Sequence, residues 1–438
     1  MLDPLRHYLK QIRSFSDLSA TKRLRYLEHP FRDFTRHSPL SFKRTISLIF
    51  GLLRKSTSIE LYDLFTLCRS KPVTKSAFCQ RRKLIKPIFF RDLFQLTVHQ
   101  FYHSFKNFHT WRGLRLFAVD GTGQTLPREP WIGEAFGFHK NQHDQVPSTR
   151  LLITFDLLNK IIYRVDLHTQ KSAEIVNAYP RVEQLPKEAI YIYDRGFAGY
   201  GLPFLHQRHG SYYVIRFKNE DSPVIMDFVQ SGEYERTINI MLKDRAYRTL
   251  RDLGLEPVWK AELVVRLVRF NLPNDEVEVL MTNLMDRRRF HYKRIGQLYG
   301  WRWGVETAIS NLKSFLQLAL TSAYTLPGVE QDLWSTFCFY NINSAFEFAT
   351  EQEVEAKTAH RKYIHQINRN MAAGLIKRWL PHLFISSERI WRAKTQVLKE
   401  MLLMHLEPYR PRPSRERKRR IIRAQDRHIY EPNYRSTM

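Results

Sequence analysis

The spacing of apolar residues divides this chain into helical and sheet-forming regions. Over residues 1–110 they recur at intervals of three and four, as in Leu61, Leu64 and Phe65, with polar and basic residues between them. This period predicts an N-terminal helical domain. From residue 114 onward the apolar residues instead form short runs rich in β-branched and aromatic side chains, which end in turn sequences and predict strands.

Five of these runs predict the first part of a mixed α/β sheet core over residues 111–217. Two of them flank Leu158-Asn159-Lys160 and predict an antiparallel hairpin, and helical sequence separates later runs from one another. The runs are 114–119, 151–155, 161–165, 189–193 and 211–215.

The remaining sequence predicts three further parts. Alternating segments and turn signals such as Ser231-Gly232 predict a β-rich insertion over residues 218–289. Helical spacing returns over residues 290–347, which would complete the core. Residues 348–438 predict a C-terminal helical region that ends in a basic, proline-containing tail at 410–420. A chain of 438 residues is expected to form two or three domains.

A short basic helix in the N-terminal domain is a candidate for reading DNA. Thr74 is a candidate N-cap for residues 75–83, which include Arg81 and Arg82. The segment resembles the recognition half of a helix-turn-helix motif, and a plain surface helix is the alternative. We expect the N-terminal domain to bind DNA.

The charge balance narrows the expected partners. The chain carries 70 Lys and Arg against 43 Asp and Glu, a formal net charge of +27, so DNA or RNA is the expected partner. Net charge bears only on nonspecific binding, and a merely basic soluble protein is the alternative. The three cysteines form no disulfide or zinc pattern, and the longest apolar run, 46–53, is far short of a membrane span. We therefore expect a cytoplasmic protein with no membrane partner.

Two carboxylates follow predicted strands, and a third lies on a predicted helix. Asp120 and Asp194 each come directly after an apolar run and before a glycine-containing turn, which predicts both at the C-terminal ends of strands. If the helix that carries Glu306 packs across the sheet, the three acids converge. Such oxygen ligands suit Mg²⁺, and a pair of ions can activate the attacking oxygen and stabilise the leaving oxygen of a phosphodiester. The alternative is that each Asp merely caps a turn.

Glu306 belongs to a polar stripe on its predicted helix. At about 100° per residue, four polar side chains fall within about 60° of one another beside an apolar face. They are Tyr299, Arg302, Glu306 and Lys313. The stripe thus combines an acid with three groups that can hold phosphates. A solvated helix face is the alternative for the stripe, and an ion pair with Glu306 is the alternative for Arg302.

Neighbouring residues carry weaker signals. The helix with the stripe is expected to break near Gly300 or Gly304, because glycine weakens helices. Trp301 projects away from the stripe and is expected in the core. His139 and His143 are spaced like metal ligands, but without a third ligand we expect them on the surface or facing DNA.

The acids and the stripe together resemble a known family. Asp120 lies in Val119-Asp-Gly-Thr122, Asp194 lies in Tyr193-Asp-Arg-Gly-Phe197, and the stripe has intervals of three, four and seven residues. These motifs resemble the DDE transposases of bacterial insertion sequences that carry the Tyr-Arg-Glu-Lys (YREK) signature. The resemblance covers residues 114–345, while the first 110 and last 90 residues match only in helical, basic character.

The resemblance implies a ribonuclease-H-like catalytic core with a β insertion between the second Asp and the Glu. It implies that the catalytic, Mg²⁺-holding residues are Asp120, Asp194 and Glu306, with Mn²⁺ as a substitute ion, and that the DNA-binding residues are Tyr299, Arg302 and Lys313. It further implies cut-and-paste transposition. Water nicks one strand at the element end, the freed 3′ hydroxyl attacks the opposite strand to form a hairpin, and the reopened end joins target DNA.

The implied partners are the terminal inverted repeats of the element, the target DNA and a second copy of the chain in a synaptic homodimer at the nucleoid. In related enzymes an aromatic residue of the insertion traps a flipped base. Trp259 is the candidate here, and core packing is the alternative. Two other functions stay open: a metal-dependent DNA nuclease that cuts without joining, and an inactive DNA-binding derivative.

Overall fold

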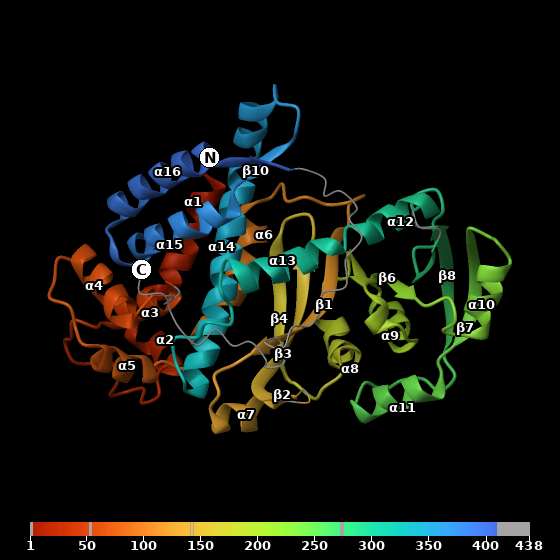
Figure 1. Cartoon of the computed structure of the whole chain (residues 1–438), viewed down its shortest axis with the longest axis horizontal. Helices are drawn as coiled ribbons and strands as arrows, with labels where there is room; N and C mark the ends of the chain where they lie inside the picture. Colours follow the sequence, from red (N-terminus) through yellow and green to blue (C-terminus); the bar gives the residue numbers. More distant parts are fainter. Residues whose placement is uncertain (1–2, 52–54, 141, 143, 272–275, 410–438) are drawn as a thin grey trace. The chain divides into compact units, whose positions relative to one another are not determined.

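The computed structural model describes residues 3–51, 55–140, 142, 144–271 and 276–409. The chain forms two compact units, each assembled from segments that are far apart in the sequence (Figure 1). The helical unit comprises Met1–Phe108, Gln124–Ser148 and Asn311–Met438, and the sheet unit comprises His109–Gly123 and Thr149–Ser310. The domain boundaries proposed from the sequence stay predictions.

The helical unit has the helices predicted at both ends of the chain. The first are α1 (Pro4–Ser16), α2 (Ala20–Arg23), α3 (Phe42–Phe50), α4 (Thr57–Leu67), α5 (Lys75–Lys83) and α6 (Ile88–Ser104), with the 3-10 turn η1 (Leu24–Tyr26). The later ones are α14 (Leu326–Thr358), α15 (Arg369–Ile385) and α16 (Glu388–Met404). Smaller elements are α7 (Pro130–Phe136), β2 (Phe138–Lys140), β10 (His365–Ile367) and β11 (Leu406–Pro408).

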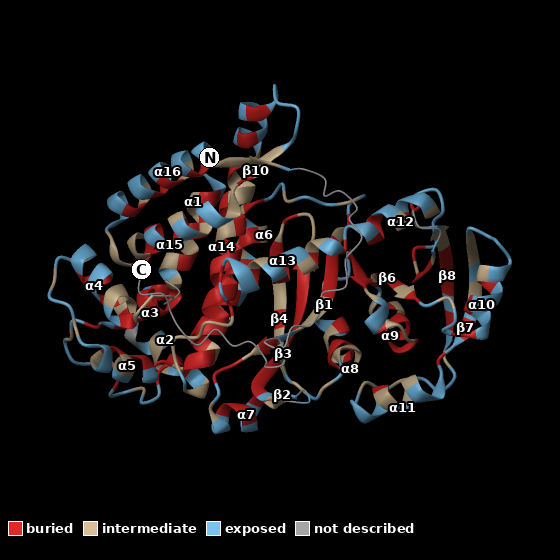
Figure 2. Ribbon diagram, viewed as in Figure 1, coloured by how far each residue is buried: buried red, intermediate tan, exposed pale blue. Residues whose placement is uncertain are grey.

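Local sequence explains where several of these helices begin. The side chains of Asp3, Ser41 and Thr74 accept backbone N–H hydrogen bonds at the starts of α1, α3 and α5. These caps satisfy donors that a helix N-terminus leaves without partners, and the Thr74 cap confirms the prediction. Helix α14 packs against α6 and α3 and is buried over most of its first half (Figure 2). It therefore forms the centre of this unit.

Arg82 anchors the basic helix α5 to α14. Its side chain is only 4% exposed. The guanidinium donates to Gln331 Oε1 at 2.6 Å, to the Gly328 carbonyl at 2.6 Å, to Asp332 Oδ1 at 2.9 Å and also to Ser322 Oγ. Arg82 thus serves the packing of the helical unit, while Lys75 and Lys83 on the same helix are exposed.

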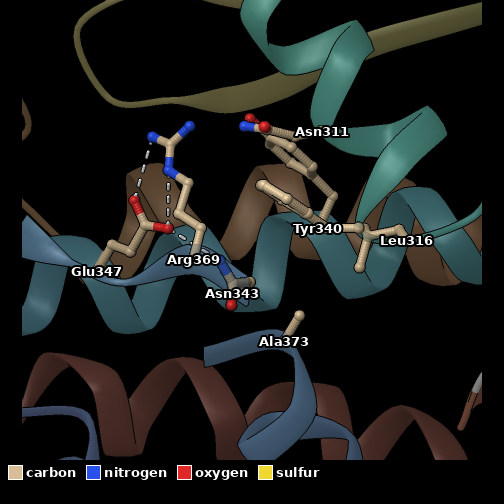
Figure 3. A pocket seen from close by; sticks show the side chains of 8 residues that line it. Asn311, Leu316, Tyr340, Asn343, Glu347, Arg369 and Ala373 are labelled. Carbon is tan, nitrogen blue, oxygen red and sulfur yellow. Dashed lines mark hydrogen bonds and ion pairs between the residues drawn. The ribbon is translucent and has the colours of Figure 1, made fainter. Parts of the chain in front are cut away.

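A small cavity lies beside α14, lined by apolar and polar side chains (Figure 3). Its volume is about 20 Å³, which is enough for about one water molecule. Asn343 donates to Glu347 at 2.9 Å, and Glu347 pairs with Arg369 at 3.3 Å. The Asn343 Oδ1 and Asn311 Nδ2 atoms are buried without a hydrogen-bond partner among the described residues. The cavity is therefore too small for a substrate and has polar groups suited to a single water.

The sheet unit is built on a mixed sheet, as predicted. Its strands are β1 (Arg115–Thr125), β3 (Gln145–Asp156), β4 (Ile161–Thr169), β5 (Ala189–Tyr193), β6 (Tyr212–Phe217), β7 (Glu235–Met241), β8 (Glu262–Asn271) and β9 (Val277–Thr282). The order is β3-β1-β5-β6-β9-β8-β7, with β4 paired to β3. Strands β3 and β4 form the predicted antiparallel hairpin, and β5 is parallel to both β1 and β6. These five strands form the central part of the mixed sheet.

Helices cover both faces of the central strands. The elements are α8 (Glu174–Ala178), η2 (Tyr179–Gln184), η3 (Arg195–Phe197), α9 (Gly201–His209), α10 (Pro223–Gln230), α11 (Asp244–Asp252), α12 (Tyr292–Gly300) and α13 (Trp303–Ser314). In β5, Tyr191 and Tyr193 join an apolar cluster that includes residues of α9, while Ile190 and Ile192 join a cluster that includes residues of α12. A strand that is buried on both faces has a continuous apolar sequence, which is why residues 189–193 could be predicted as a strand.

The predicted β insertion extends the core sheet. Strand β9 pairs antiparallel with β6 from Val214–Thr282 to Phe217–Val279, and β8 and β7 follow outward. The insertion also contains the helices α10 and α11, which the sequence analysis did not predict. The strands of the insertion are thus a continuation of the strands that carry the acids.

Strand β1 differs from its prediction. The sequence predicted an end at Val119, but β1 runs through Asp120 to Thr125. The reason lies in its neighbour β3, which begins at Gln145 rather than at Leu151 and offers pairing to a longer β1. Residues 145–150 are mostly polar and carry no apolar run, so the sequence pattern did not reveal them. The prediction that Asp120 ends a strand is therefore wrong.

The helix break near Gly300 is confirmed. Helix α12 ends at Gly300 and α13 begins at Trp303. Because of this break Trp301 turns outward and is 44% exposed, so the prediction that it lies in the core is wrong. Among the described residues, no helix has the length and apolar character to cross a bilayer.

Candidate active site

The first carboxylate of the site lies within β1 at a closely packed position. The backbone N–H of Gly121 donates to Asp120 Oδ1 at 2.9 Å, and the Asp120 side chain is 15% exposed. A Cβ on Gly121 would lie 2.2 Å from Cδ of Glu174. Glycine at 121 thus lets β1 lie close to α8, while Asp120, the preceding residue, points to the opposite face of the strand, toward Arg302.

The second carboxylate directly follows β5, as predicted. Strand β5 is the parallel neighbour of β1, with Tyr193 opposite Val119. The next residues, Asp120 within β1 and Asp194 directly after β5, therefore lie beside each other. Asp194 Oδ1 accepts the backbone N–H of Gly196 at 2.8 Å and caps η3, which fixes its orientation.

The third carboxylate, Glu306, lies in the first turn of α13. Gly304 lets this end of the helix approach the hairpin, since a Cβ there would lie 2.9 Å from Cδ2 of Leu157. Val305 and Ala308 are buried beneath the helix. The apolar face of α13 therefore holds the helix on the sheet and leaves Glu306 partly exposed at its edge.

Two of the predicted acids, Asp194 and Glu306, act electrostatically on the third, Asp120. Burial first, and the negative charge of Asp194 second, raise the pKa of Asp120 to about 6, with a smaller contribution from Glu306. The charge of Arg302 and the hydrogen bond from Gly121 oppose this rise. A charged carboxylate raises the pKa of another in this way when the two lie close together. The structure thus brings together residues that are 74 and 112 positions apart in the chain.

These carboxylates fit a hard divalent cation by chemistry and charge. All three offer oxygen donors, the ligands that Mg²⁺ prefers, and with Arg302 they leave two uncompensated negative charges when ionised. Among the described residues, no three Asp, Glu, His or Cys side chains are already arranged to hold a metal ion. The cation that touches the acids is Arg302, which pairs with Glu306 at 2.7 Å and with Asp120 at 4.0 Å.

Arg302 and Tyr299 are buried beside the acids. Arg302 is 7% exposed, and its ion pair with Glu306 is the alternative that the sequence had left open. Its guanidinium carbon lies 5.8 Å from the ring centre of Tyr299 and 5.2 Å from that of Trp303. Burial would lower the pKa of Arg302, but the hydrogen bond to Glu306 and nearby negative charges raise it. Burial raises the pKa of the Tyr299 hydroxyl. Contact of either residue with DNA stays a prediction.

The structure also shows charged neighbours that the sequence analysis missed. Glu278 on β9 is buried and pairs with Arg216 on β6 at 2.8 Å. Burial raises the pKa of Glu278, opposed mainly by Arg216. Both residues interrupt apolar strand runs, and a charge within such a run was the signal that could have revealed them.

The other predicted residues have varied surroundings. Lys313 lies in the last turn of α13, within the helical unit, and is exposed. Trp259 is 53% exposed, which excludes core packing, and its ring packs edge-on against Tyr247 with centres 4.7 Å apart. His139 is exposed on β2, as expected. His143 and the basic tail at 410–420 lie outside the described residues.

Comparisons with known proteins identify a family and similar proteins. The family model described as "Transposase DDE domain" matches residues 111–342, a little over half of the chain. The chain is 24% identical over 274 residues to transposase InsG for insertion sequence element IS4 of Escherichia coli (strain K12), a match that covers 62% of this chain. The matched region spans 60% of the length of that relative. A solved structure of piggyBac transposase in a synaptic complex with hairpin DNA is 12% identical, covers 91% of this chain and 85% of that chain, and has a TM-score of 0.47.

Proposed function

The chain belongs to the transposase DDE domain family, and we propose that it is a DNA transposase that moves an insertion sequence by cut and paste. The observation that carries the proposal is the grouping of Asp120 within β1, Asp194 directly after β5 and Glu306 on α13, where Asp194 and Glu306 both act electrostatically on Asp120. Three acids from remote segments are what a two-metal phosphodiester site requires. The YREK interpretation of Tyr299, Arg302, Glu306 and Lys313 is part of this proposal.

In the proposed reaction the three acids hold Mg²⁺, with Mn²⁺ as a substitute. When bound, a pair of such ions lowers the pKa of the attacking water or hydroxyl and stabilises charge on the leaving oxygen. The acids determine where the ions would bind. Backbone N–H groups of Gly121 and Gly196 orient the carboxylates of Asp120 and Asp194, respectively. Low exposure of Asp120 keeps bulk water away from one side of the site.

The substrate steps follow from phosphodiester chemistry. Water attacks the phosphorus at the element end, and the bond to the 3′ oxygen breaks to leave a 3′ hydroxyl. That hydroxyl attacks the opposite strand and displaces its 5′-side neighbour, which closes a hairpin. Hydrolysis reopens the hairpin, and the 3′ hydroxyl then attacks target DNA. Each strand-transfer step replaces one phosphodiester bond with another, and each hydrolysis step consumes one water molecule. Neither kind of step requires a covalent protein intermediate, so the main task of the protein is to position the reacting groups.

The proposed partners are DNA and a second copy of the chain. The net charge of +27 suits the terminal inverted repeats and target DNA, and Arg302, Tyr299 and Lys313 are proposed to contact the backbone near the cut. A synaptic homodimer on two ends is part of the proposal, as is action in the cytoplasm at the nucleoid. InsG is named as a transposase for an insertion sequence, which supports the same substrate class here.

The test uses the purified full chain, Mg²⁺ and DNA that carries the ends of its own element. We expect hairpin and joined products from the wild type. Asp120→Asn should bind the ends but leave them uncut, because the amide keeps the shape and loses the anionic ligand. Products that are cut but never joined would instead indicate a nuclease. Equal binding with no cutting by either protein would indicate a DNA-binding derivative.

A further inference from the structure

Arg302 occupies an unusual position among the acids. It lies between α12 and α13, almost fully buried, and touches two of the three carboxylates. The contact to Glu306 is a hydrogen-bonded ion pair at 2.7 Å, while the contact to Asp120 is a looser ion pair at 4.0 Å. The guanidinium therefore offsets part of the negative charge of the cluster without binding tightly to both acids.

The hydrogen bonding of Arg302 is incomplete. Its Nε atom is buried and has no hydrogen-bond partner among the described residues. A buried donor without a partner costs free energy, so this conformation is not the one that best satisfies the side chain. The aromatic rings of Tyr299 and Trp303 hold the guanidinium through contacts that tolerate sliding and rotation. Arg302 is thus held in place chiefly by the negative charge of the acids.

The charge that attracts Arg302 is also the charge that would attract a divalent cation. A guanidinium and such an ion cannot both lie among the same carboxylates without repelling each other across a few ångströms of partly buried protein. We propose that Arg302 is the internal counter-ion of the acid cluster, which pairs with Glu306 and Asp120 until a divalent cation displaces it. This inference rests on the proposed metal binding by the three acids.

Displacement has a consequence for the positioning of DNA. While Arg302 pairs with Glu306, one ligand carboxylate and one amino group of the guanidinium are engaged. Once the ion takes over the acids, the fork of Arg302 donors becomes available to a phosphate oxygen. Arg302 is therefore a positioning residue: binding of the cation to the acids frees its guanidinium to bind a DNA phosphate.

The first test is a calorimetric titration of the full chain with Mn²⁺ in the absence of DNA. Arg302→Gln should bind Mn²⁺ more tightly than the wild type, on the order of fivefold or more, since the variant lacks the competing charge. Arg216→Gln is the matched control, because among the described residues Arg216 forms its ion pair with Glu278 and not with any of the three acids. The affinity of this variant for Mn²⁺ should equal that of the wild type.

The second test follows Arg302 itself in the wild type. Trp303 is exposed and carries the Arg302 guanidinium against its ring, so displacement should change its fluorescence. We expect Mg²⁺ to shift the emission component that is lost in Trp303→Phe, and to leave that component unchanged in Arg302→Gln. The shift itself is measured with Arg302 intact, and Arg302→Gln serves only as the control.

The outcomes separate this inference from the proposed function. If the wild type binds Mn²⁺ and Arg302→Gln binds it equally or more weakly, Arg302 is a supporting residue and the counter-ion role is wrong, while the metal site stands. An unchanged Trp303 signal on Mg²⁺ binding also contradicts the inference alone. If neither the wild type nor Arg302→Gln binds Mn²⁺, both the inference and the proposed metal site fail.

Discussion

Two buried arginines, one in each unit of the molecule, differ in how many of their donor groups are hydrogen-bonded. Arg82 in the helical unit donates to four groups, including the buried carboxylate of Asp332. Arg302 in the sheet unit makes one close ion pair and one loose one, and its Nε has no partner among the described residues. Both side chains are less than a tenth exposed, so burial alone does not distinguish their roles.

The difference lies in how completely each guanidinium is satisfied. A saturated buried arginine fixes one packing arrangement, because every alternative loses several hydrogen bonds at once. Arg266 in the sheet unit follows the same rule, with donors to Glu235 and to the carbonyls of Leu284 and Phe290. An arginine with spare donors beside excess negative charge is suited to change partners. In our proposal, Arg302 uses these spare donors when it changes partners.

The largest expected effect on stability comes from replacing Arg82, whose guanidinium donates to four groups. Arg82→Gln leaves Asp332 buried without its counter-charge and should lower the free energy of unfolding by about 3–5 kcal/mol. Urea denaturation followed by circular dichroism measures this change. Lys83→Gln, one residue away and exposed, is the control and should have little effect. If Arg82→Gln lowered the free energy of unfolding by less than about 1 kcal/mol, Arg82 would not have the packing role that distinguishes it from Arg302.

A second saturated group predicts the pH dependence of stability. Buried His206 is hydrogen-bonded to Tyr193 and Ser211, and burial lowers its pKa from 6.5 to about 3. Between these values the unfolded chain binds a proton that the folded chain does not, so stability falls as pH falls below 6.5. The loss should reach about 2 kcal/mol at about pH 5.

The measurement is the free energy of unfolding at several pH values between about 7 and 5. In His206→Gln this part of the pH slope should vanish, whatever the absolute stability of the variant. An equal slope in the two proteins would show that His206 is not kept neutral by its surroundings.

A smaller effect is expected where the backbone of the site packs on Glu174. Gly121→Ala places a methyl group against this side chain, which is held by Arg150 at 2.7 Å, and should cost about 1–2 kcal/mol of stability. DNA cleavage should also fall, because Asp120 is the next residue. Gly123→Ala is the matched control, since the nearest atoms to its Cβ are 3.9 Å away. Similar behaviour of the two variants would contradict the close packing at Gly121.

The smallest effect on stability is expected for Arg302→Gln, the same substitution as in Arg82→Gln. Glu306 is partly exposed, so loss of its ion pair with Arg302 should change the free energy of unfolding by about 1 kcal/mol or less. Thermal and urea unfolding in the presence of EDTA measure it. A loss as large as that of Arg82→Gln would assign Arg302 to packing.

Much of the sheet unit could be predicted because its signals are local. The run 189–193 is buried on both faces and appears as a continuous apolar stretch, so Asp194 was located correctly after it. The glycine at 300 marked the helix break in the same way. Such features depend on a few neighbouring residues and therefore survive in the sequence pattern.

The features that escaped prediction depend on partners far away in the chain. Strand β1 continues past Asp120 because β3 pairs with it, and no pattern near Asp120 encodes that length. Arg82 looked like a DNA-reading residue because only its remote partners, 240 to 250 positions later, reveal that it is buried. Tyr299 and Glu306 lie on separate helices, so a single helical stripe described their spacing but not their arrangement.

The central claim is that residues 120, 194 and 306 share a divalent cation, and iron-directed cleavage of the chain tests it directly. Fe²⁺ bound in place of Mg²⁺, with ascorbate and peroxide, generates radicals that cut the backbone close to the ion. The account predicts cuts near all three positions, suppressed together by excess Mg²⁺ and lost together in Asp120→Asn. Cuts confined to one or two of these segments, or unaffected by Mg²⁺, would contradict it.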